Sequence, residues 1–140
     1  MKKSWLPCLF FPLALLTACD RKTEWKETWP LMSYSFDDAK HSYVGLNCMG
    51  IPVLALIGGD WPADAKQFTL NVDGVVRKIE IFRGQHGRAM IIDDQKIVAS
   101  FTAAKREIIF RVGKNWARSV PPSPRLEDAR QRCLSRSAQA

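Results

Sequence analysis

The stretch "KQFTLNVDGVVRKIEIF", residues 66–82, indicates most directly how this chain folds. Asp73-Gly74 within it is a two-residue signal for a primed turn between antiparallel strands. Pairing about that turn gives one mostly apolar face, with the pairs Phe68–Ile79, Leu70–Arg77 and Val72–Val75. The other face is mostly polar, with the pairs Gln67–Glu80, Thr69–Lys78 and Asn71–Val76. Because the turn and the alternation agree, the stretch predicts a β-hairpin.

Similar patterns on both sides of this hairpin predict more strands. Met32, Tyr34 and Phe36 alternate with serines, a period of two that is typical of a half-buried strand. Apolar or alternating runs predict further strands over residues 43–49, 51–57, 89–92, 97–99, 107–112 and 116–120. Of these, 89–92 and 97–99 flank "DDQK" as a hairpin, and the last two flank "GKN" as another. Residues 101–106 are expected to form a short helix or a turn.

The C-terminal segment changes to a helical pattern. Pro121-Pro122 stops sheet pairing, because proline lacks the backbone donor. Ser123 suits a helix cap and Pro124 the first helical position. One inward stripe follows at helical spacing, made of Leu126, Ala129, Cys133 and Leu134. We therefore expect an α+β fold, mainly an antiparallel β-sheet of hairpins with a C-terminal helix docked on it.

The cysteines supply the expected link between helix and sheet. Cys48 lies on a predicted strand and Cys133 on the inward stripe of the helix. The N-terminal motif described below implies that Cys8 leaves with a signal peptide and that Cys19 takes lipid, which leaves Cys48 and Cys133 as an even pair in an exported protein. Such a pair favours a disulfide, two free buried thiols being the alternative. No CxxC motif is present, so a thioredoxin-like redox role has no support.

The N-terminus reads as a targeting segment rather than part of the fold. Met1-Lys2-Lys3 is a positive region, and residues 6–16 are an apolar run too short for a membrane span. Leu16-Thr17-Ala18-Cys19 then resembles the lipobox of bacterial prolipoproteins. The resemblance implies cleavage before Cys19, lipid on Cys19 and attachment of the chain to a membrane. Asp20 directly after that cysteine resembles an inner-membrane retention signal.

This resemblance sets the expected organisation and location. We expect a signal peptide over residues 1–18, a lipidated tether over 19–30 and one periplasmic β-rich domain over 31–140. Trp25 and Trp29 in the tether are candidates for the membrane interface, or for packing on the domain. A cell-membrane anchor facing the periplasm also argues against nucleic acid as a partner.

Positive charge is concentrated in the last third of the chain. The formal net charge is +7, and residues 105–140 hold nine Lys and Arg against three acidic residues. Arg125 and Arg132 fall outside the inward stripe of the helix and should point outward. Such a basic surface suits a protein partner with an acidic surface, the alternative being a merely solvated face.

Catalytic and metal-binding patterns are scarce. The two histidines, His41 and His86, lack zinc-ligand spacing, and neither a GxSxG elbow nor a phosphate-binding glycine loop occurs. We predict no metal, no cofactor and no catalytic residue. The loop "RGQHGR" places His86 between Arg83 and Arg88, which suits binding of a carboxylate or phosphate, or is simply a polar hairpin loop.

These observations favour a non-enzymatic protein-binding module. Inhibitors, immunity proteins and exclusion proteins are envelope lipoproteins of this size and location, an analogy of place and not of sequence. The alternative is an accessory lipoprotein subunit of an envelope or secretion assembly. An enzyme using His86 has the least support, since no base, nucleophile and orienting group can be named together.

Overall fold

In the computed structural model, residues 24–37, 42–58, 65–80 and 89–139 are described, and every structural statement below concerns these residues. Within them the chain forms nine strands and two helices. Their bounds are β1 Lys26–Thr28, β2 Leu31–Asp37, β3 Ser42–Cys48, β4 Pro52–Ile57, β5 Gln67–Val72, β6 Val75–Glu80, β7 Ala89–Ile92, α3 Gln95–Thr102, β8 Ile108–Val112, β9 Trp116–Val120 and α4 Pro124–Gln139.

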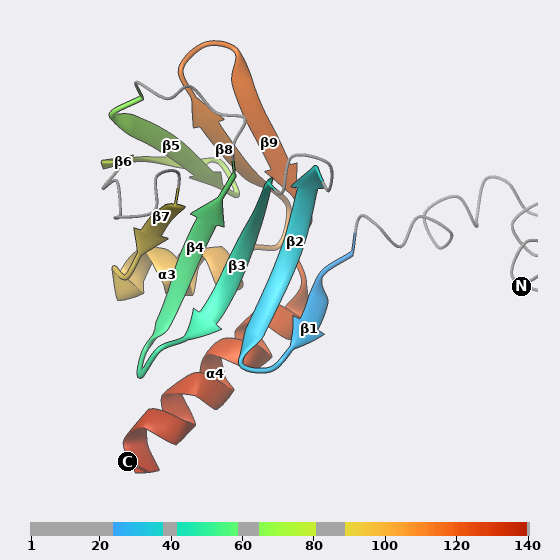
Figure 1. The fold of residues 1–140 in the computed structure, drawn as a ribbon, viewed down its shortest axis with the longest axis vertical. Coiled ribbons are helices and arrows are strands. Elements are labelled where there is room, and N and C mark those ends of the chain that lie inside the picture. The colour runs from blue at the N-terminus through green and yellow to red at the C-terminus, as the bar shows by residue number, and fades with distance from the viewer. Residues whose placement is uncertain (1–23, 38–41, 59–64, 81–88, 140) are drawn as a thin grey trace, which may run out of the picture.

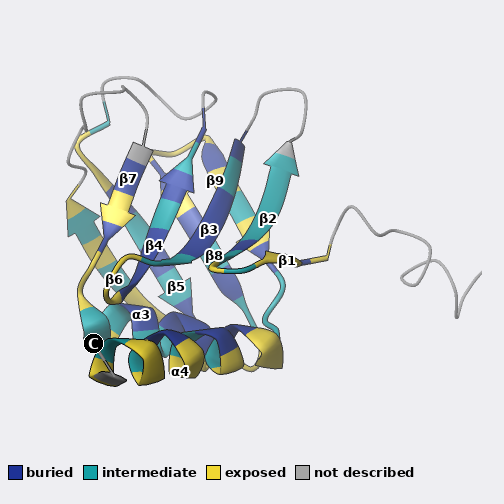
Figure 2. Ribbon diagram, turned by 60° about the horizontal axis from the view of Figure 1, so that its bottom comes forward, coloured by how far each residue is buried: buried dark blue, intermediate teal, exposed yellow. Residues whose placement is uncertain are grey.

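The strands make two antiparallel sheets. One has the order β1-β2-β3-β4-β7 and the other β6-β5-β8-β9. The two sheets face each other, and α3 and α4 lie together across one end of them (Figure 1). The exposed residues of α4 lie on its side turned away from the sheets (Figure 2). The α+β class, the mainly antiparallel sheets and the docked C-terminal helix are confirmed.

The hairpin predicted from residues 66–82 forms with the predicted register. β5 and β6 pair Phe68 with Ile79, Leu70 with Arg77 and Val72 with Val75. Asp73 and Gly74 both have positive φ, 51° and 91°, as a primed turn requires. The hairpin of β8 and β9 is confirmed as well, with Val112 paired to Trp116 across its turn.

Asp73 does more than form a turn. Its carboxylate accepts hydrogen bonds from the backbone N–H groups of Lys105, Arg106 and Glu107, at 2.9, 2.6 and 3.0 Å. These backbone bonds, that from Lys105 first, hold the pKa of Asp73 below its usual value of 3.8. The turn of one hairpin therefore fastens the segment that leads into β8.

We expect Asp73→Asn to destabilise the fold at neutral pH. Asparagine tolerates the positive φ, so the change removes the charged acceptor with little added backbone strain. Because the folded-state pKa is lowered, this stabilisation is complete above pH 3.8 and is lost as the pH falls through the folded pKa. Urea unfolding should show a lower free energy of unfolding than wild type at pH 7, and this difference should disappear in acid. Asp93→Asn, a change at an exposed residue, should leave the free energy of unfolding unchanged at both pH values. An equal difference in the free energy of unfolding in acid would contradict stabilisation by the charged carboxylate of Asp73.

One predicted hairpin is wrong. Residues 97–99 do not form a strand beside β7 but lie in the helix α3. Asp94 caps this helix, because its side chain accepts hydrogen bonds from the N–H groups of Lys96 and Ile97. Val98, Phe101 and Thr102 then share its buried face. The acids expected to form a turn instead start a helix.

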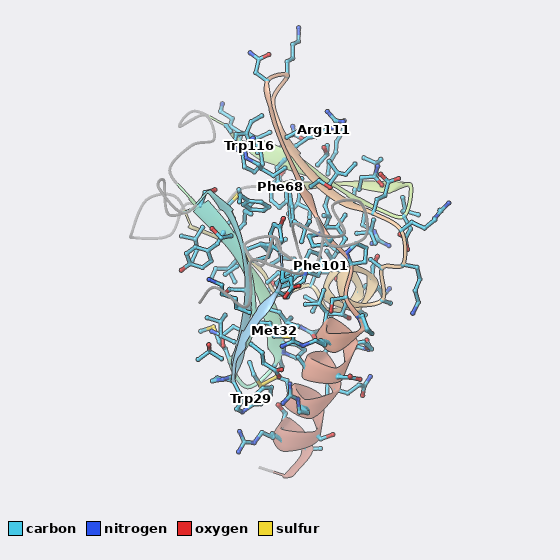
Figure 3. All side chains as sticks on the ribbon, turned by 90° about the vertical axis from the view of Figure 1, so that its right-hand side faces the viewer. Trp29, Met32, Phe68, Phe101, Arg111 and Trp116 are labelled. Atoms are coloured by element: carbon cyan, nitrogen blue, oxygen red, sulfur yellow. A yellow bond between two sulfur atoms is a disulfide. The ribbon has the colours of Figure 1, made fainter. Side chains whose placement is uncertain are left out.

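The core lies between the two sheets and is closed by α3. Phe101 from α3 is fully buried and meets Phe110 of β8 with ring centroids 6.1 Å apart. Met32 of β2 and Phe68 of β5 are buried on facing sheets (Figure 3). Phe110 also meets Phe36 of β2, with ring centroids 6.2 Å apart, so Phe36, Phe101 and Phe110 connect both sheets to α3.

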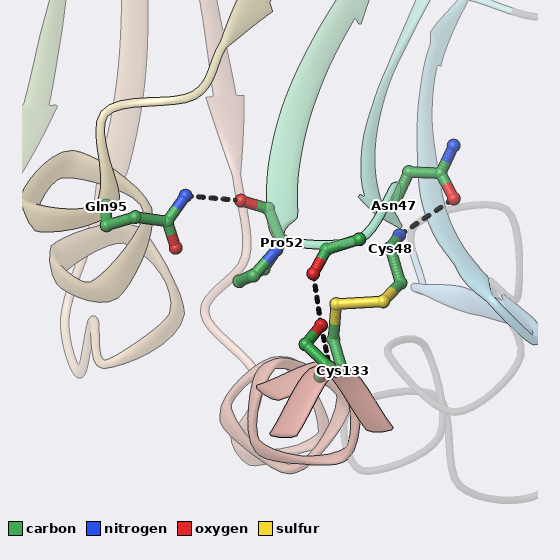
Figure 4. The surroundings of a disulfide bond; sticks show 7 residues. Asn47, Cys48, Pro52, Gln95 and Cys133 are labelled. Atoms are coloured by element: carbon green, nitrogen blue, oxygen red, sulfur yellow. Dashed lines mark hydrogen bonds between the residues drawn. A yellow bond between two sulfur atoms is a disulfide. The ribbon is translucent and has the colours of Figure 1, made fainter. Parts of the chain in front are cut away.

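A disulfide fastens α4 to the five-stranded sheet. Cys48 at the end of β3 and Cys133 of α4 are bonded, with their Cα atoms 5.5 Å apart (Figure 4). Beside it, Gln95 of α3 donates a hydrogen bond to the carbonyl of Pro52 in β4, at 2.9 Å. The predicted pairing is thus confirmed. Of the two described helices, neither has the length and apolar character needed to span a membrane.

The fold begins earlier than the expected boundary at residue 31. Trp25, assigned above to the tether, is buried and donates its indole N–H to the carbonyl of Pro121 at 2.8 Å. Its ring meets Phe101 edge-on at 6.1 Å. Lys26–Thr28 then adds β1 to the sheet. Of the two alternatives for Trp25, packing on the domain is the one observed.

Candidate functional site

The structure describes only part of the predicted site. Cys19, Arg83, His86 and Arg88 lie outside the described residues. The segment that holds Arg83 to Arg88 connects β6 of one sheet to β7 of the other. Arg125 and Arg132 are described, and both lie on the exposed side of α4 as expected.

Arg125 and Arg132 meet on one acidic side chain. Arg125 binds Glu27 of β1 at 3.1 Å, and Arg132 binds the other carboxylate oxygen of Glu27. Hydrogen bonds from Arg132 and then Arg125 hold the pKa of Glu27 below its usual value of 4.5. The two arginines predicted to contact a partner therefore hold β1 against α4.

A shallow groove lies beside this pair. It has a volume of about 460 Å³ and is lined by Trp29, Gln131, Arg132, Ser135 and Arg136. The guanidinium carbons of Arg132 and Arg136 lie 4.6 and 5.7 Å from the centroid of the Trp29 ring. Figure 3 shows Trp29 beside α4. We call this the arginine–tryptophan groove.

The groove offers chemistry suited to anionic groups. Arg132 and Arg136 are one helical turn apart, so their guanidinium groups lie together over one indole ring. Arg136 makes no ion pair with any described residue, which leaves its charge available. The sequence interpretation missed Arg136 and Trp29 as a pair. The i, i+4 spacing of the arginines was a signal, but nothing local placed Trp29 against them.

A second surface lies on β6, at the edge of the four-stranded sheet. Val75 and Val76 there are 55% and 60% exposed, and the next residues are Arg77 and Lys78. We call these four residues the β6 edge. Among the described strands only β5 pairs with β6. Large apolar side chains on an open edge strand favour pairing with another chain.

The backbone direction of β6 can be derived from its hairpin. Val72 and Val75 flank a two-residue loop, and such a flanking pair exchanges its hydrogen bonds within the hairpin. The alternate residues Val76 and Lys78 therefore direct N–H and C=O groups away from β5. The β6 edge thus presents backbone donors and acceptors together with apolar and basic side chains. One sign of this surface was present in the sequence, because Val76 pairs with Asn71 on the otherwise polar face of the predicted hairpin.

Arg77 adds a further observation at this edge. Its Nη1 atom is buried and has no hydrogen-bond partner.

Metal chemistry has no support in the described residues, where no group of three or more His, Cys, Asp or Glu side chains is placed to hold an ion.

Comparison with protein-family models, with curated proteins and with solved structures found no match to this chain.

Proposed function

We propose that the protein is a bacterial envelope lipoprotein whose domain acts as a non-enzymatic protein-binding module. Support for the anchor comes from the lipobox resemblance at residues 16–19. The disulfide between Cys48 and Cys133 is consistent with an oxidising compartment such as the periplasm. Asp20 favours the inner membrane.

The observation that carries the binding role is the β6 edge. An extended segment of a partner can add to such an edge, with backbone bonds supplying affinity and side chains specificity. Lys78 suits an acidic segment, and Val76, which lies on the same face of the strand, offers an apolar contact. The segment 81–88, which holds the candidate residues Arg83, His86 and Arg88, follows directly along the chain.

Arg125 and Arg132 are weaker candidates for this contact. Both guanidinium groups are engaged by Glu27, so a partner would have to compete with an existing pair. Their exposed charge is also partly cancelled by that carboxylate. We therefore place the partner contact on β6 rather than on α4.

The test is capture from envelope membranes with the mature lipoprotein, followed by mass spectrometry of the recovered partner and of residue Cys19. We expect Val76→Asp and Lys78→Glu together to weaken binding of that partner at least tenfold, because the edge then repels an acidic segment. The fold should survive, since both side chains are exposed. Lys114→Glu with Asn115→Asp, which makes the same total charge change on the exposed β8–β9 turn, is the matched control.

The identity of the partner separates the candidate roles. A toxin or a lytic enzyme would indicate an inhibitor or immunity protein, and a conjugation component an exclusion protein. Subunits of an envelope machine would indicate the accessory role instead. Unchanged affinity in the β6 double variant would reject this edge as the contact, and wild-type Cys19 without lipid would reject the anchor.

A further inference from the structure

Two turns of the five-stranded sheet lie at one end of it, beside α4. Leu31 at the start of β2 pairs with Asn47 near the end of β3, and Asn47 pairs with Val53 near the start of β4. The β1–β2 and β3–β4 connections therefore share the same end (Figure 1). Neighbouring strands are about 4.8 Å apart, so the two turns are separated by about 10 Å.

The β3–β4 turn carries apolar side chains into solvent. Met49 is 64% exposed and Ile51 is 44% exposed. Ser137 of α4 donates a hydrogen bond to the carbonyl of Gly50 between them, which seats the turn on the last part of the helix. These two side chains are thus held outward and not folded into the core.

Tryptophan and arginine complete the same end. Trp29 occupies the β1–β2 turn, and Arg132 and Arg136 lie over its ring. An indole is favoured at the boundary between lipid headgroups and acyl chains. Guanidinium groups attract anionic headgroups, most strongly within a Debye length of the surface. We call Trp29, Met49, Ile51, Arg132 and Arg136 the α4 end face.

The length of the preceding chain places this face near the proposed anchor. Four residues lie between Cys19 and Glu24, where the described chain begins, and the stretch from Cys19 to Glu24 spans at most about 18 Å. From Glu24 the chain runs through β1, Lys26–Thr28, to the turn at Trp29, and this stretch covers at most about 17 Å toward the α4 end face. A lipid on Cys19 can therefore reach the level of the face but not far beyond it.

We infer that the α4 end face rests on an anionic lipid surface, with Met49 and Ile51 entering the headgroup region and Arg136 contacting phosphate groups. This inference rests on the anchor proposed for Cys19. It gives the domain one orientation on the membrane. The β8–β9 turn, at the end opposite α4, then points away from the bilayer (Figure 1).

The test uses the oxidised, unlipidated chain from Asp20 and sedimentation with vesicles. The described fold begins at Glu24 and contains the whole core cluster, so this chain retains it. We expect binding to vesicles of phosphatidylglycerol and phosphatidylcholine to exceed binding to phosphatidylcholine alone at least tenfold. Added salt should reduce it.

Variants assign the binding to the face. Arg136→Gln should weaken binding to the anionic vesicles about fivefold, the usual effect of one basic residue near such a surface. Met49→Gln with Ile51→Gln should weaken it about tenfold, because apolar burial is lost. Lys114→Gln, on the opposite turn, should leave it unchanged.

Several results would overturn the inference. One is equal binding to both vesicle types, and another is no effect of the Met49 and Ile51 changes. Self-association that those changes abolish would assign the face to a second copy of the chain. Capture of an acidic protein that Arg136→Gln prevents, without vesicle binding, would assign it to that protein. Because this chain lacks Cys19, these outcomes do not depend on whether the natural protein carries lipid.

Discussion

Removing the disulfide, by Cys48→Ala with Cys133→Ala, should lower the free energy of unfolding by about 4 kcal/mol. The bond joins residues 85 apart, and closing a loop of that length restricts the unfolded chain strongly. Urea unfolding at neutral pH measures the loss.

The same variant also tests the α4 end face. Cys133 fixes α4 beside the β3–β4 turn, so its loss should loosen the contact between Ser137 and Gly50. Hydrogen exchange should then increase in α4 more than in β8. The matched control is wild-type protein unfolded by urea in the presence of a reductant. Its free energy of unfolding should equal that of the variant within about 1 kcal/mol. Unchanged stability in both would show that the bond does not constrain the unfolded chain.

Phe101→Ala should destabilise by about 3 to 5 kcal/mol, as truncation of a fully buried phenylalanine does. The ring lies where α3 meets both sheets, and it contacts Trp25 and Phe110 at centroid distances of 6.1 Å each. Its loss opens a cavity beside Trp25 and Phe110 that the packed core fills only partly. Urea unfolding measures the loss of stability, and near-ultraviolet circular dichroism reports the altered packing of the aromatic core.

Two comparisons make the Phe101 result specific. Phe101→Leu retains most of the volume and should cost clearly less than alanine. Ile91→Ala, at a residue that is 52% exposed, should change stability by about 0.5 kcal/mol or less. Equal losses for alanine and leucine at position 101 would mean that cavity formation is not the cause.

Local signals predicted the strands well where turn chemistry and periodicity agreed. Asp73-Gly74 and the alternation around it determined both the hairpin and its register. Residues 97–99 failed because a short apolar run is compatible with strand or helix. Asp94 favours the helix because its side chain caps the first turn. The helix is also favoured because it buries Val98 and Phe101 in the core, whose other side is formed by residues far away in the sequence.

The candidate site divides in the same way. The helical period placed Arg125 and Arg132 outside the inward stripe, and the structure agrees. Their partner Glu27 is about 100 residues earlier, so the pairing depends on β1 joining the sheet. The binding role of Arg83, His86 and Arg88, which lie outside the described residues, remains a prediction from the sequence.

By itself the sequence determined the β5–β6 and β8–β9 hairpins, the C-terminal helix and the pairing of Cys48 with Cys133. The hairpins and the helix depend on spacing along the chain, and the disulfide depends on the two cysteines that remain once Cys8 and Cys19 are assigned to the N-terminal segment. Tertiary structure alone decided that Trp25 enters the core, that Trp29 lies under Arg132 and Arg136, and that β6 pairs only with β5 among the described strands. These features depend on which elements become neighbours in space. That choice follows from burying apolar surface of the whole chain at once, a requirement that no local stretch contains.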